Sequence, residues 1–587
     1  MLKIFKYLKR NDWLLVLFSV AFIVVQVWLD LKLPDYMAEI TTLLQTEGTT
    51  VSDLMTPGAY MLLCAVGSMA AAVIVGFFAA KVAAGLAKRL RGLVFDKTLS
   101  FSMEEMNHFS TASLITRSTN DITQIQFIIA MGLQVIIKAP ILAIWAITKI
   151  SDKSWQWTTA TGVAVLVLCM MLSVIIIFAL PKFKIIQSLT DNLNRVTREN
   201  LTGIRVVRAY NAEHYQQAKF EQANMDLTKT NLFANRLMAI IHPGMTLIMS
   251  GLSVSIYWIG AYLIQEAEMM NRITVFSDMV VFSSYAMQVV MAFMMVSIIF
   301  IMLPRAAVSA KRILEVLETK ANITDGNLTE GKPGVVGEIE FNNVSFTYPD
   351  SEEPILHNIS FKALKGETVA FIGATGSGKS SLINLIPRFY DVSEGEVLVD
   401  GVNVKDYKQE ALHDKIGYVS QSAVLFSGDV SSNVSYGEAG HMKPSLQAIK
   451  EAVEIAQGKE FVERLEGQYE GHISQGGMNV SGGQKQRLSI ARAIYRKPEI
   501  YIFDDSFSAL DYKTDRALRA ALKKETADAT TLIVAQRIGT IKDADRIIVL
   551  QDGEIVGNGT HEQLMDSCKT YQEIAYSQLS KEELAHG

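Results

Sequence analysis

Residues 368–386 read TVAFIGATGSGKSSLINLI, and this stretch decides the fold of the second half of the chain. A β-rich run comes first, residues 373–380 fit the pattern G-x-x-x-x-G-K-[ST], and a helical run follows. Glycines let such a loop approach phosphate groups closely, and amides of the loop and of the helix start bind anionic oxygens. The sequence therefore predicts an α/β domain with a site for nucleotide phosphates.

The motif also predicts a role for individual side chains. Lys379 is expected to reach the β- and γ-phosphates, and Ser380 to ligate Mg²⁺. A second apolar strand-like run ends in Asp504, the usual position of a carboxylate that holds Mg²⁺ directly or through water. ATP and Mg²⁺ are the predicted cofactors. The predicted nucleotide-binding residues of the loop are Gly373, Ala374, Thr375, Gly376, Ser377, Gly378, Lys379, Ser380 and Ser381.

A third motif, Ser481-Gly482-Gly483-Gln484, lies between these two and precedes a basic helical run. With this combination the sequence resembles the ATP-binding cassette (ABC) superfamily. The resemblance implies that Ser481, Gly482, Gly483 and Gln484 contact the ATP bound by a partner. It further implies that Tyr348 stacks on adenine, that Gln421 senses Mg²⁺ and the membrane domain, that Asp511 lies in a loop crossing the dimer interface, and that residues 470–477 contact the partner's intracellular loops.

The first half of the chain is predicted to span a membrane. A bilayer core about 30 Å thick needs roughly 20 apolar helical residues. Six segments meet that length, the third of them interrupted by Lys138 and Pro140. They are 13–33, 55–80, 122–148, 154–181, 237–265 and 279–304.

Basic residues indicate which side of the membrane each loop faces. The first ten residues and the long segment 182–236 are rich in lysine and arginine, whereas the opposite side carries only Lys32, Lys149, Lys153 and Arg272. Both termini and both long loops are therefore predicted to be cytoplasmic. Apolar residues at helical spacing indicate that the spanning helices continue into those loops, with turns near 109–114 and 201–209.

The resemblance then implies the architecture of an ABC exporter half-transporter of the type IV, domain-swapped kind, with the spans of two halves intertwined. Residues 1–315 are the predicted transmembrane domain, 316–336 a linker and 337–587 the nucleotide-binding domain. The net charge of −5 gives no indication of nucleic-acid binding. The protein resembles bacterial proteins most, so the predicted location is the plasma membrane, in contact with membrane lipids.

A substrate cavity is predicted inside the spans. Lys138 is an ionisable residue within a span, where charges are costly and often functional. Pairing of Lys138 with a carboxylate in the bundle is the alternative. The last span carries Met287, Met291 and Met295, whose flexible side chains suit a promiscuous cavity, although methionine also serves plain packing. The predicted cargo is a hydrophobic or amphipathic small molecule.

Two positions depart from the family pattern. Asp505 stands where the family usually has the glutamate that activates the attacking water, and Gln536 stands where it usually has a histidine. The shorter aspartate moves the carboxylate by about 1 Å, which can cost roughly 100-fold in rate, and glutamine carries neither a proton nor a positive charge. Both changes face the γ-phosphate, so this site is predicted to hold ATP and hydrolyse it slowly.

The protein thus resembles the degenerate subunit of heterodimeric bacterial multidrug exporters. The predicted partner is a second half-transporter with an intact glutamate and histidine, whose catalytic site would use the intact motif 481–484 of this chain. Three alternatives stay open: an active homodimer in which Asp505 suffices, a nucleotide-gated channel or regulatory subunit, and an exporter of lipid, peptide or porphyrin.

Overall fold

The computed structural model describes residues 2–44, 46, 48–151, 153–269, 271–437 and 445–578 of the 587. The chain forms two compact units, and each is described by itself. One comprises Met1–Leu99 and Thr111–Thr319, and the other comprises Ser100–Ser110 and Lys320–Gly587. The short segment 100–110 therefore folds with the second half of the chain, although the first half surrounds it in sequence.

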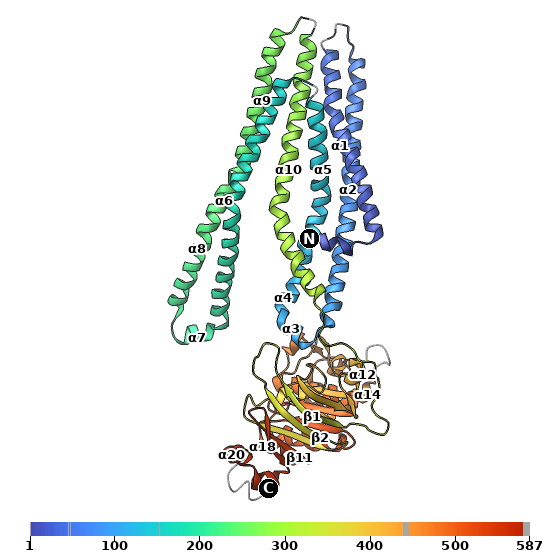
Figure 1. Ribbon diagram of the computed structural model, residues 1–587, viewed down its shortest axis with the longest axis vertical. Helices are drawn as coiled ribbons and strands as arrows, with labels where there is room; N and C mark the ends of the chain where they lie inside the picture. The colour runs from blue at the N-terminus through green and yellow to red at the C-terminus, as the bar shows by residue number, and fades with distance from the viewer. Residues whose placement is uncertain are drawn as a thin grey trace. The chain divides into compact units, whose positions relative to one another are not determined.

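The regular structure of the described residues in the first unit is helical (Figure 1). Six segments of the described residues are long and apolar enough to cross a membrane, which confirms the predicted number of spans. The long helices are α1 (Arg10–Leu44), α2 (Val51–Leu99), α5 (Ile122–Ser151), α6 (Trp155–Thr202), α8 (Glu213–Ala239), α9 (Ile241–Glu266) and α10 (Arg272–Glu318). The short elements are a 3₁₀ turn (Leu2–Tyr7), α4 (Thr111–Thr116), a π-helical turn (Arg117–Asp121) and α7 (Ile204–Ala209).

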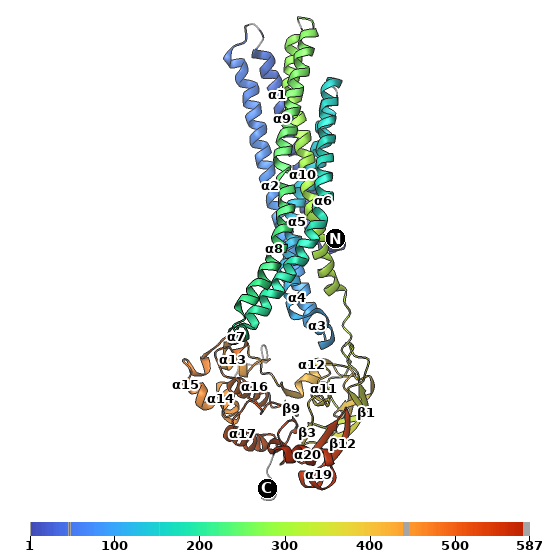
Figure 2. The ribbon, with the colours of Figure 1, turned by 90° about the vertical axis from the view of Figure 1, so that its left-hand side faces the viewer.

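The helices extend well beyond the predicted spans, as the sequence indicated for the two long loops. Helix α2 continues to Leu99, and Leu86, Leu90 and Val94 on one of its faces are buried. The predicted turns are also present, since α3 ends at Phe109 and α7 begins at Ile204. Figure 2 shows α6 and α8 running side by side to α7.

One detail of the sequence interpretation is wrong. Lys138 and Pro140 do not interrupt the third span, because α5 is one continuous helix from Ile122 to Ser151. Helix α10 runs from Arg272 to Glu318 and contains the predicted span 279–304. Polar and charged residues near its end bind neighbouring elements: Ser309 Oγ donates to Asp121 Oδ1 at 2.9 Å, and Arg117 Nη1 lies 2.9 Å from Glu315 Oε2.

The second unit is the predicted α/β domain. Its main sheet has the strand order β12-β11-β3-β10-β9-β6, in which all strands except the edge strand β12 are parallel. An antiparallel sheet has the order β2-β1-β4-β5, and β7 pairs with β8. The strands are β1 (Ile339–Phe346), β2 (Leu356–Ala363), β3 (Thr368–Gly373), β4 (Glu394–Val399), β5 (Val402–Asn403), β6 (Ile416–Val419), β7 (Gly428–Asp429), β8 (His472–Ile473), β9 (Ile500–Asp504), β10 (Thr530–Val534), β11 (Arg546–Gln551) and β12 (Glu554–Gly559).

Helices accompany the parallel sheet of this unit. The sequence order alternates strand and helix around the parallel sheet, as expected for a sheet buried on both faces. The helices are α3 (Met103–Phe109), α11 (Lys379–Asn384), α12 (Gln409–Asp414), α13 (Val430–Val434), α14 (Leu446–Ile455), α15 (Lys459–Arg464), α16 (Gly482–Arg496), α17 (Tyr512–Glu525), α18 (Ile538–Ile541), α19 (His561–Ser567) and α20 (Lys569–Gln578).

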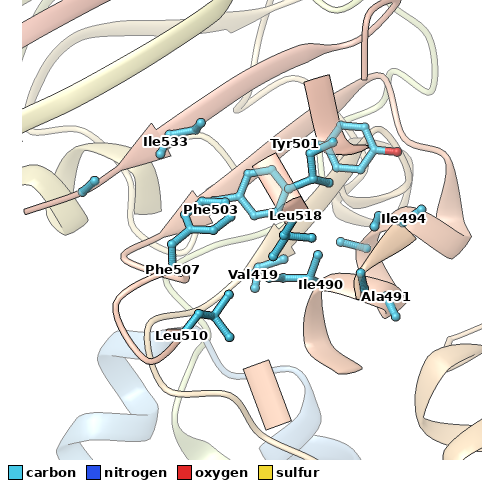
Figure 3. Packing of buried hydrophobic residues seen from close by; sticks show 14 of the residues in the cluster. Val419, Ile490, Ala491, Ile494, Tyr501, Phe503, Phe507, Leu510, Leu518 and Ile533 are labelled. Carbon is cyan, nitrogen blue, oxygen red and sulfur yellow. The ribbon is translucent and has the colours of Figure 1, made fainter. Parts of the chain in front are cut away.

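The central strands form the core of the domain. Every residue of β9 and β10 is buried, which explains why their sequences are continuous apolar runs rather than alternating ones. Figure 3 shows Tyr501 and Phe503 of β9 packed toward Ile490 of α16 and Leu518 of α17. The strand that ends in Asp504 is thereby fixed from its buried face.

Truncation of this core is expected to destabilise the domain strongly. Phe503 is 0% exposed, so Phe503→Ala should leave a cavity that costs about 3–5 kcal/mol and lowers the Tm of the cassette by about 10 °C. Differential scanning fluorimetry of the full chain in detergent measures this change. Phe426→Ala is the control, because Phe426 is 43% exposed, and an equal loss in both variants would contradict this account of the core.

Candidate nucleotide site and membrane-embedded polar cluster

The predicted nucleotide site lies at one edge of the parallel sheet. The carboxyl ends of parallel strands meet at the same edge, where α/β domains bind ligands. Here β3 leads into residues 373–381, the phosphate loop, and β6 leads to Gln421. Strand β9 ends in Asp504, and β10 leads to Gln536. Residues separated by more than 160 positions in the sequence are therefore brought together by strand order alone.

Glycines shape the phosphate loop. Gly376 has φ +89° and Gly378 has φ +92°, a left-handed conformation that side chains disfavour. A Cβ atom at Gly373 would lie 2.1 Å from the carbonyl oxygen of Leu550. The loop can therefore wrap closely around a bound group only with glycine at these positions.

Lys379 is a buried cation inside this loop. Its Nζ donates to the carbonyl oxygens of Gly373 at 2.8 Å and Ala374 at 2.7 Å. Burial lowers the pKa of the Lys379 ammonium, and the carboxylates of Asp505 and Asp504 act in the opposite direction. A buried ammonium bonded to neutral carbonyls is stabilised by an anion brought into the loop, so its environment fits a polyphosphate.

Ser380 and Asp504 meet as the motif predicted. Ser380 Oγ donates to Asp504 Oδ1 at 2.9 Å, so the two expected Mg²⁺ ligands lie side by side. Burial raises the pKa of Asp504, and the charge of Asp505 adds to that effect. No cluster of three or more acidic, histidine or cysteine residues suited to a metal exists among the described residues. This donor set fits Mg²⁺. The ion is usually bound by a few protein groups together with phosphate and water oxygens, rather than by protein ligands alone.

The two departures from the family pattern contact each other. Gln536 Nε2 donates to Asp505 Oδ2 at 3.0 Å, and Gln421 Nε2 approaches the same oxygen at 3.4 Å. Ser508 Oγ donates to the main-chain oxygen of Asp505 at 2.8 Å. Burial raises the pKa of the Asp505 carboxyl, and the hydrogen bond from Gln421 opposes part of this rise. The structure therefore gathers Gln421, Asp505 and Gln536 around one carboxylate oxygen.

Tyr348 borders the phosphate loop on another side. Its hydroxyl lies 3.0 Å from Ser381 Oγ, and its ring meets the ring of Tyr390 edge to face at 5.1 Å between centroids. The stacking of Tyr348 on adenine stays a prediction. Tyr390 was not predicted from the sequence, because no motif marks it.

The motif 481–484 begins α16. Ser481 and Gln484 form a reciprocal capping pair, in which the main-chain amide of each residue bonds the other side chain, at 2.8 and 3.4 Å. Ser481 is exposed, and no hydrogen bond or ion pair between described residues joins this motif to the phosphate loop. Figure 2 shows α16 apart from α11, which follows the phosphate loop. This geometry leaves the motif free to meet another chain.

Asp511 starts the next helix, α17. It is exposed, and its carboxylate accepts from the amide of Thr514 at 3.0 Å. Hydrogen bonding by the side chain and the amide of Thr514 lowers the pKa of Asp511. Its proposed place at the dimer interface stays a prediction.

Helix α3 belongs to the second unit through contacts that the sequence did not reveal. Glu105 is 5% exposed, and its Oε1 accepts from the amide of Asn322 at 2.9 Å. Asn107 Nδ2 lies 3.3 Å from the hydroxyl of Tyr390, which in turn contacts Tyr348. This intracellular turn is therefore linked to the aromatic side of the nucleotide site.

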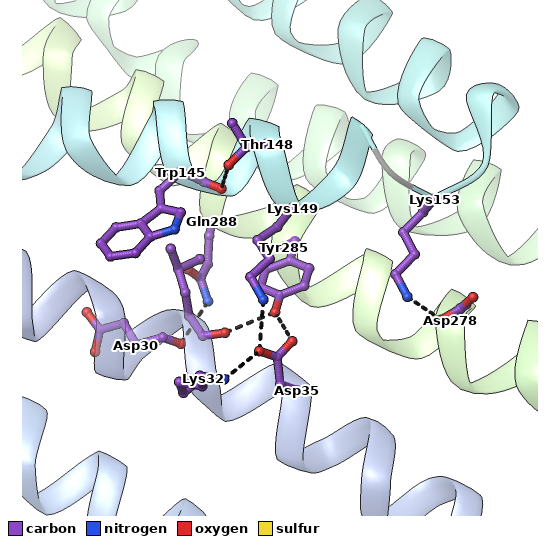
Figure 4. A network of polar contacts seen from close by, with 11 residues as sticks. Asp30, Lys32, Asp35, Trp145, Thr148, Lys149, Lys153, Asp278, Tyr285 and Gln288 are labelled. Carbon is purple, nitrogen blue, oxygen red and sulfur yellow. Dashed lines mark hydrogen bonds and ion pairs between the residues drawn. The ribbon is translucent and has the colours of Figure 1, made fainter.

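The spans contain a cluster of polar contacts around two aspartates of α1 (Figure 4). Asp35 lies 2.9 Å from Lys149 Nζ and also accepts from Tyr285, and Lys153 pairs with Asp278 at 2.6 Å. Lys138 Nζ lies 3.1 Å from Asp30 Oδ2. The structure thus provides Lys138 with the carboxylate that the sequence analysis left as an alternative to a substrate role.

The three methionines lie on the same helix as Tyr285. Met287, Met291 and Met295 are half-buried on α10. Gln288, next to Met287, approaches the main-chain oxygen of Asp30 at 3.4 Å, while its own Oε1 is buried without a hydrogen-bond partner among the described residues. Cavity lining by these methionines stays a prediction.

Comparison with known proteins shows the family. Residues 16–320 match the ABC transporter transmembrane region and residues 356–508 match the ABC transporter family. The chain therefore belongs to the ABC transporter family and is a multi-pass membrane protein, an ATP-driven exporter half with a nucleotide-binding cassette.

Individual relatives agree with this class. The chain is 40% identical to an uncharacterized ABC transporter ATP-binding protein of Mycobacterium tuberculosis, with 93% of each chain covered. It is 31% identical to an ATP-dependent lipid A-core flippase of Aromatoleum aromaticum, with 86% of this chain and 82% of the relative covered. A bacterial Atm1-family ABC exporter with ATP bound has the same fold, with a TM-score of 0.77, 23% identity, and coverage of 97% of this chain and 98% of that one.

Removal of the buried ammonium is expected to abolish tight nucleotide binding. Lys379→Ala should weaken binding of a fluorescent ATP analogue about 10–100-fold, the value of a charge-assisted hydrogen bond. Fluorescence titration of the purified chain measures the Kd. Lys408→Ala, an exposed lysine of the same domain, is the control, and equal affinity of wild type and Lys379→Ala would contradict the site.

The Lys138–Asp30 pair is expected to contribute to stability. Lys138→Met leaves a carboxylate in the bundle and should cost about 2 kcal/mol, whereas the double variant Asp30→Asn/Lys138→Met should recover most of that loss. Thermal unfolding of the wild type, the single variants Asp30→Asn and Lys138→Met, and the double variant measures the coupling between the two residues. Lys153→Met breaks a more exposed pair and should cost less.

A different result would favour a substrate role for Lys138. If Lys138→Met leaves the Tm unchanged but abolishes stimulation of the ATPase by a hydrophobic cargo, Lys138 contacts substrate.

Proposed function

We propose that this chain is one subunit of a heterodimeric exporter of hydrophobic or amphipathic compounds, and that its own nucleotide site hydrolyses ATP slowly. The observation that carries the proposal is the state of Asp505. Its Oδ2 atom is shared by Gln536 Nε2 at 3.0 Å and Gln421 Nε2 at 3.4 Å. The carboxylate at the position of the water-activating glutamate is thus short and occupied by two amides.

This arrangement is poorly suited to hydrolysis. A general base needs a free oxygen within hydrogen-bond reach of the attacking water. Aspartate withdraws the carboxylate by about 1 Å relative to glutamate, a displacement that can cost roughly 100-fold. Gln536 can donate a hydrogen bond to a γ-phosphate but cannot supply a positive charge or a proton.

The groups expected to bind phosphate and Mg²⁺ support nucleotide binding by contrast. Lys379 is a buried cation in the phosphate loop, and Ser380 and Asp504, the expected Mg²⁺ ligands, contact each other. Mg²⁺ bound there would neutralise charge on the phosphate oxygens. These features support a site that retains ATP, with the cassette pair held together around it.

The partner's site is expected to be the active one. The exposed Ser481 at the start of α16 can meet ATP on the partner's phosphate loop. A homodimer would contain two impaired sites, whereas a heterodimer contains one. ATP closes the cassettes, the long intracellular helices transmit closure to the spans, and hydrolysis at the partner's site reopens them.

A homodimeric exporter is the second candidate, and one observation favours it. Burial raises the pKa of Asp505, and a more basic carboxylate is a stronger proton acceptor. For the cargo, similarity to a lipid A-core flippase favours a lipid-like amphipathic molecule among the candidate compounds.

ATPase measurements separate the two candidates. The purified chain in nanodiscs is expected to turn over about 100-fold more slowly than the same chain paired with a half-transporter that has glutamate and histidine at the two positions. Asp505→Glu/Gln536→His should raise the rate of the chain alone, because it restores reach and charge at the γ-phosphate. Asp528→Glu, an exposed substitution of the same kind, is the control. Rapid turnover by the wild-type chain alone would refute the heterodimer proposal.

A further inference from the structure

The side chain of Gln578 forms hydrogen bonds to the main chain on both sides of Arg537. Its Oε1 accepts from the amide of Ile538 at 2.9 Å, and its Nε2 donates to the carbonyl of Gln536 at 2.7 Å. One planar amide thus makes two hydrogen bonds to backbone groups two residues apart. Gln578 is the last residue of α20, and no motif in the sequence marks it.

The two backbone groups held by Gln578 lack partners from regular structure. Ile538 begins the four-residue helix α18, and the first amides of a helix have no partner within the helix. Gln536 follows the end of β10, beyond the last residue paired in the sheet. The carboxamide of glutamine offers a donor and an acceptor in one planar group, so the residue type suits this double contact.

The segment to which Gln578 is hydrogen-bonded determines where the side chain of Gln536 points. We define residues 535–538 as the switch segment. Its start is fixed by the amide of Ala535, which donates to the carbonyl of Phe371 at 3.2 Å. Its other end is held by Gln578, and between them Gln536 Nε2 reaches Asp505 Oδ2 at 3.0 Å.

Helix α20 is a firm support for this contact. Tyr571 and Ala575 are 0% exposed in the main core of the domain. The Tyr571 hydroxyl lies 2.7 Å from His561 Nδ1, and Gln572 Nε2 donates to the carbonyl of Met565 at 2.6 Å. Gln578 itself is exposed, so its side chain is ordered by the two bonds to the switch segment rather than by packing.

We infer that Gln578 is a positioning residue that sets the geometry of the switch segment, and hence the rate of ATP hydrolysis at this chain's own site. The inference rests on the proposed function only in placing Gln536 and Asp505 at the γ-phosphate. Both hydrogen bonds that the structure describes for the Gln578 side chain go to main-chain atoms, so its effect is expected whether residue 536 is glutamine or histidine.

Hydrogen–deuterium exchange tests the contact without any need for activity. In the full-length chain, Gln578→Ala removes the acceptor of the Ile538 amide, so peptides covering 536–541 should exchange at least about fivefold faster. Gln578→Glu keeps the acceptor but not the donor, and should retain part of the protection. Gln572→Ala is the matched control, because it removes a similar glutamine bond on the same helix away from the switch segment. Unchanged exchange in Gln578→Ala would overturn the inference.

Kinetics test the consequence. In the Asp505→Glu/Gln536→His background, Gln578→Ala should lower kcat about tenfold and leave the KM for ATP within about twofold, since the loss concerns alignment rather than binding. Gln578→Glu should be intermediate and Gln572→Ala unchanged. An unchanged kcat, a rise in KM alone, or an equal loss in Gln572→Ala would overturn the positioning role.

The exchange and kinetic experiments also distinguish failure of this inference from failure of the proposed function. If the wild-type chain alone proves active, the heterodimer proposal fails, and the same kinetic comparison is made in the wild-type background. There, loss of kcat with accelerated exchange would still support the role of Gln578.

Discussion

The meeting of four parallel strands at one edge of a sheet determines the position of almost every group at the nucleotide site. Strand β3 delivers the phosphate loop, β9 delivers Asp504 and Asp505, and the loops after β6 and β10 deliver Gln421 and Gln536. Because β9 and β10 are buried throughout, the carboxylates at their edge are fixed by the core and not by surface contacts. Asp505 follows β9 directly, so the position of its carboxylate depends on this buried strand end.

That rigidity is the basis of the proposed separation of ATP binding from hydrolysis in this chain. Lys379, Ser380 and Asp504 act through charge and proximity, and all three have the contacts expected of a nucleotide site. The roles of Asp505 and Gln536 depend more strongly on geometry, since activation of water needs a particular distance from the carboxylate and a particular charge. In this structure the two residues bond each other. In the proposed heterodimer, the exposed motif at the start of α16 serves the nucleotide site of the second chain.

Features that a local motif defines could be predicted from the sequence, whereas contacts between residues far apart in the sequence could not. The phosphate loop, the strand ending in Asp504 and the six spans were predictable because a few consecutive residues define each of them. The pairing of Lys138 with Asp30 joins residues 108 positions apart, and the contact of Gln578 with the switch segment depends on how α20 packs. Near the end of α10, Ser309 and Arg312 bind Asp121 of the π-helical turn, a contact between distant residues that no motif marks.

The most direct test of the central claim is the fate of ATP bound to this chain's own phosphate loop. In a single-turnover experiment, ATP labelled on the γ-phosphate is mixed with excess chain paired with an active half whose own phosphate-loop lysine has been replaced, and release of labelled phosphate is followed. The account predicts that the bound label stays intact for about 100 times longer than one turnover of the unmodified pair. Release of the label at the turnover rate of that pair would show that Asp505 is a competent catalytic carboxylate, and would contradict the account.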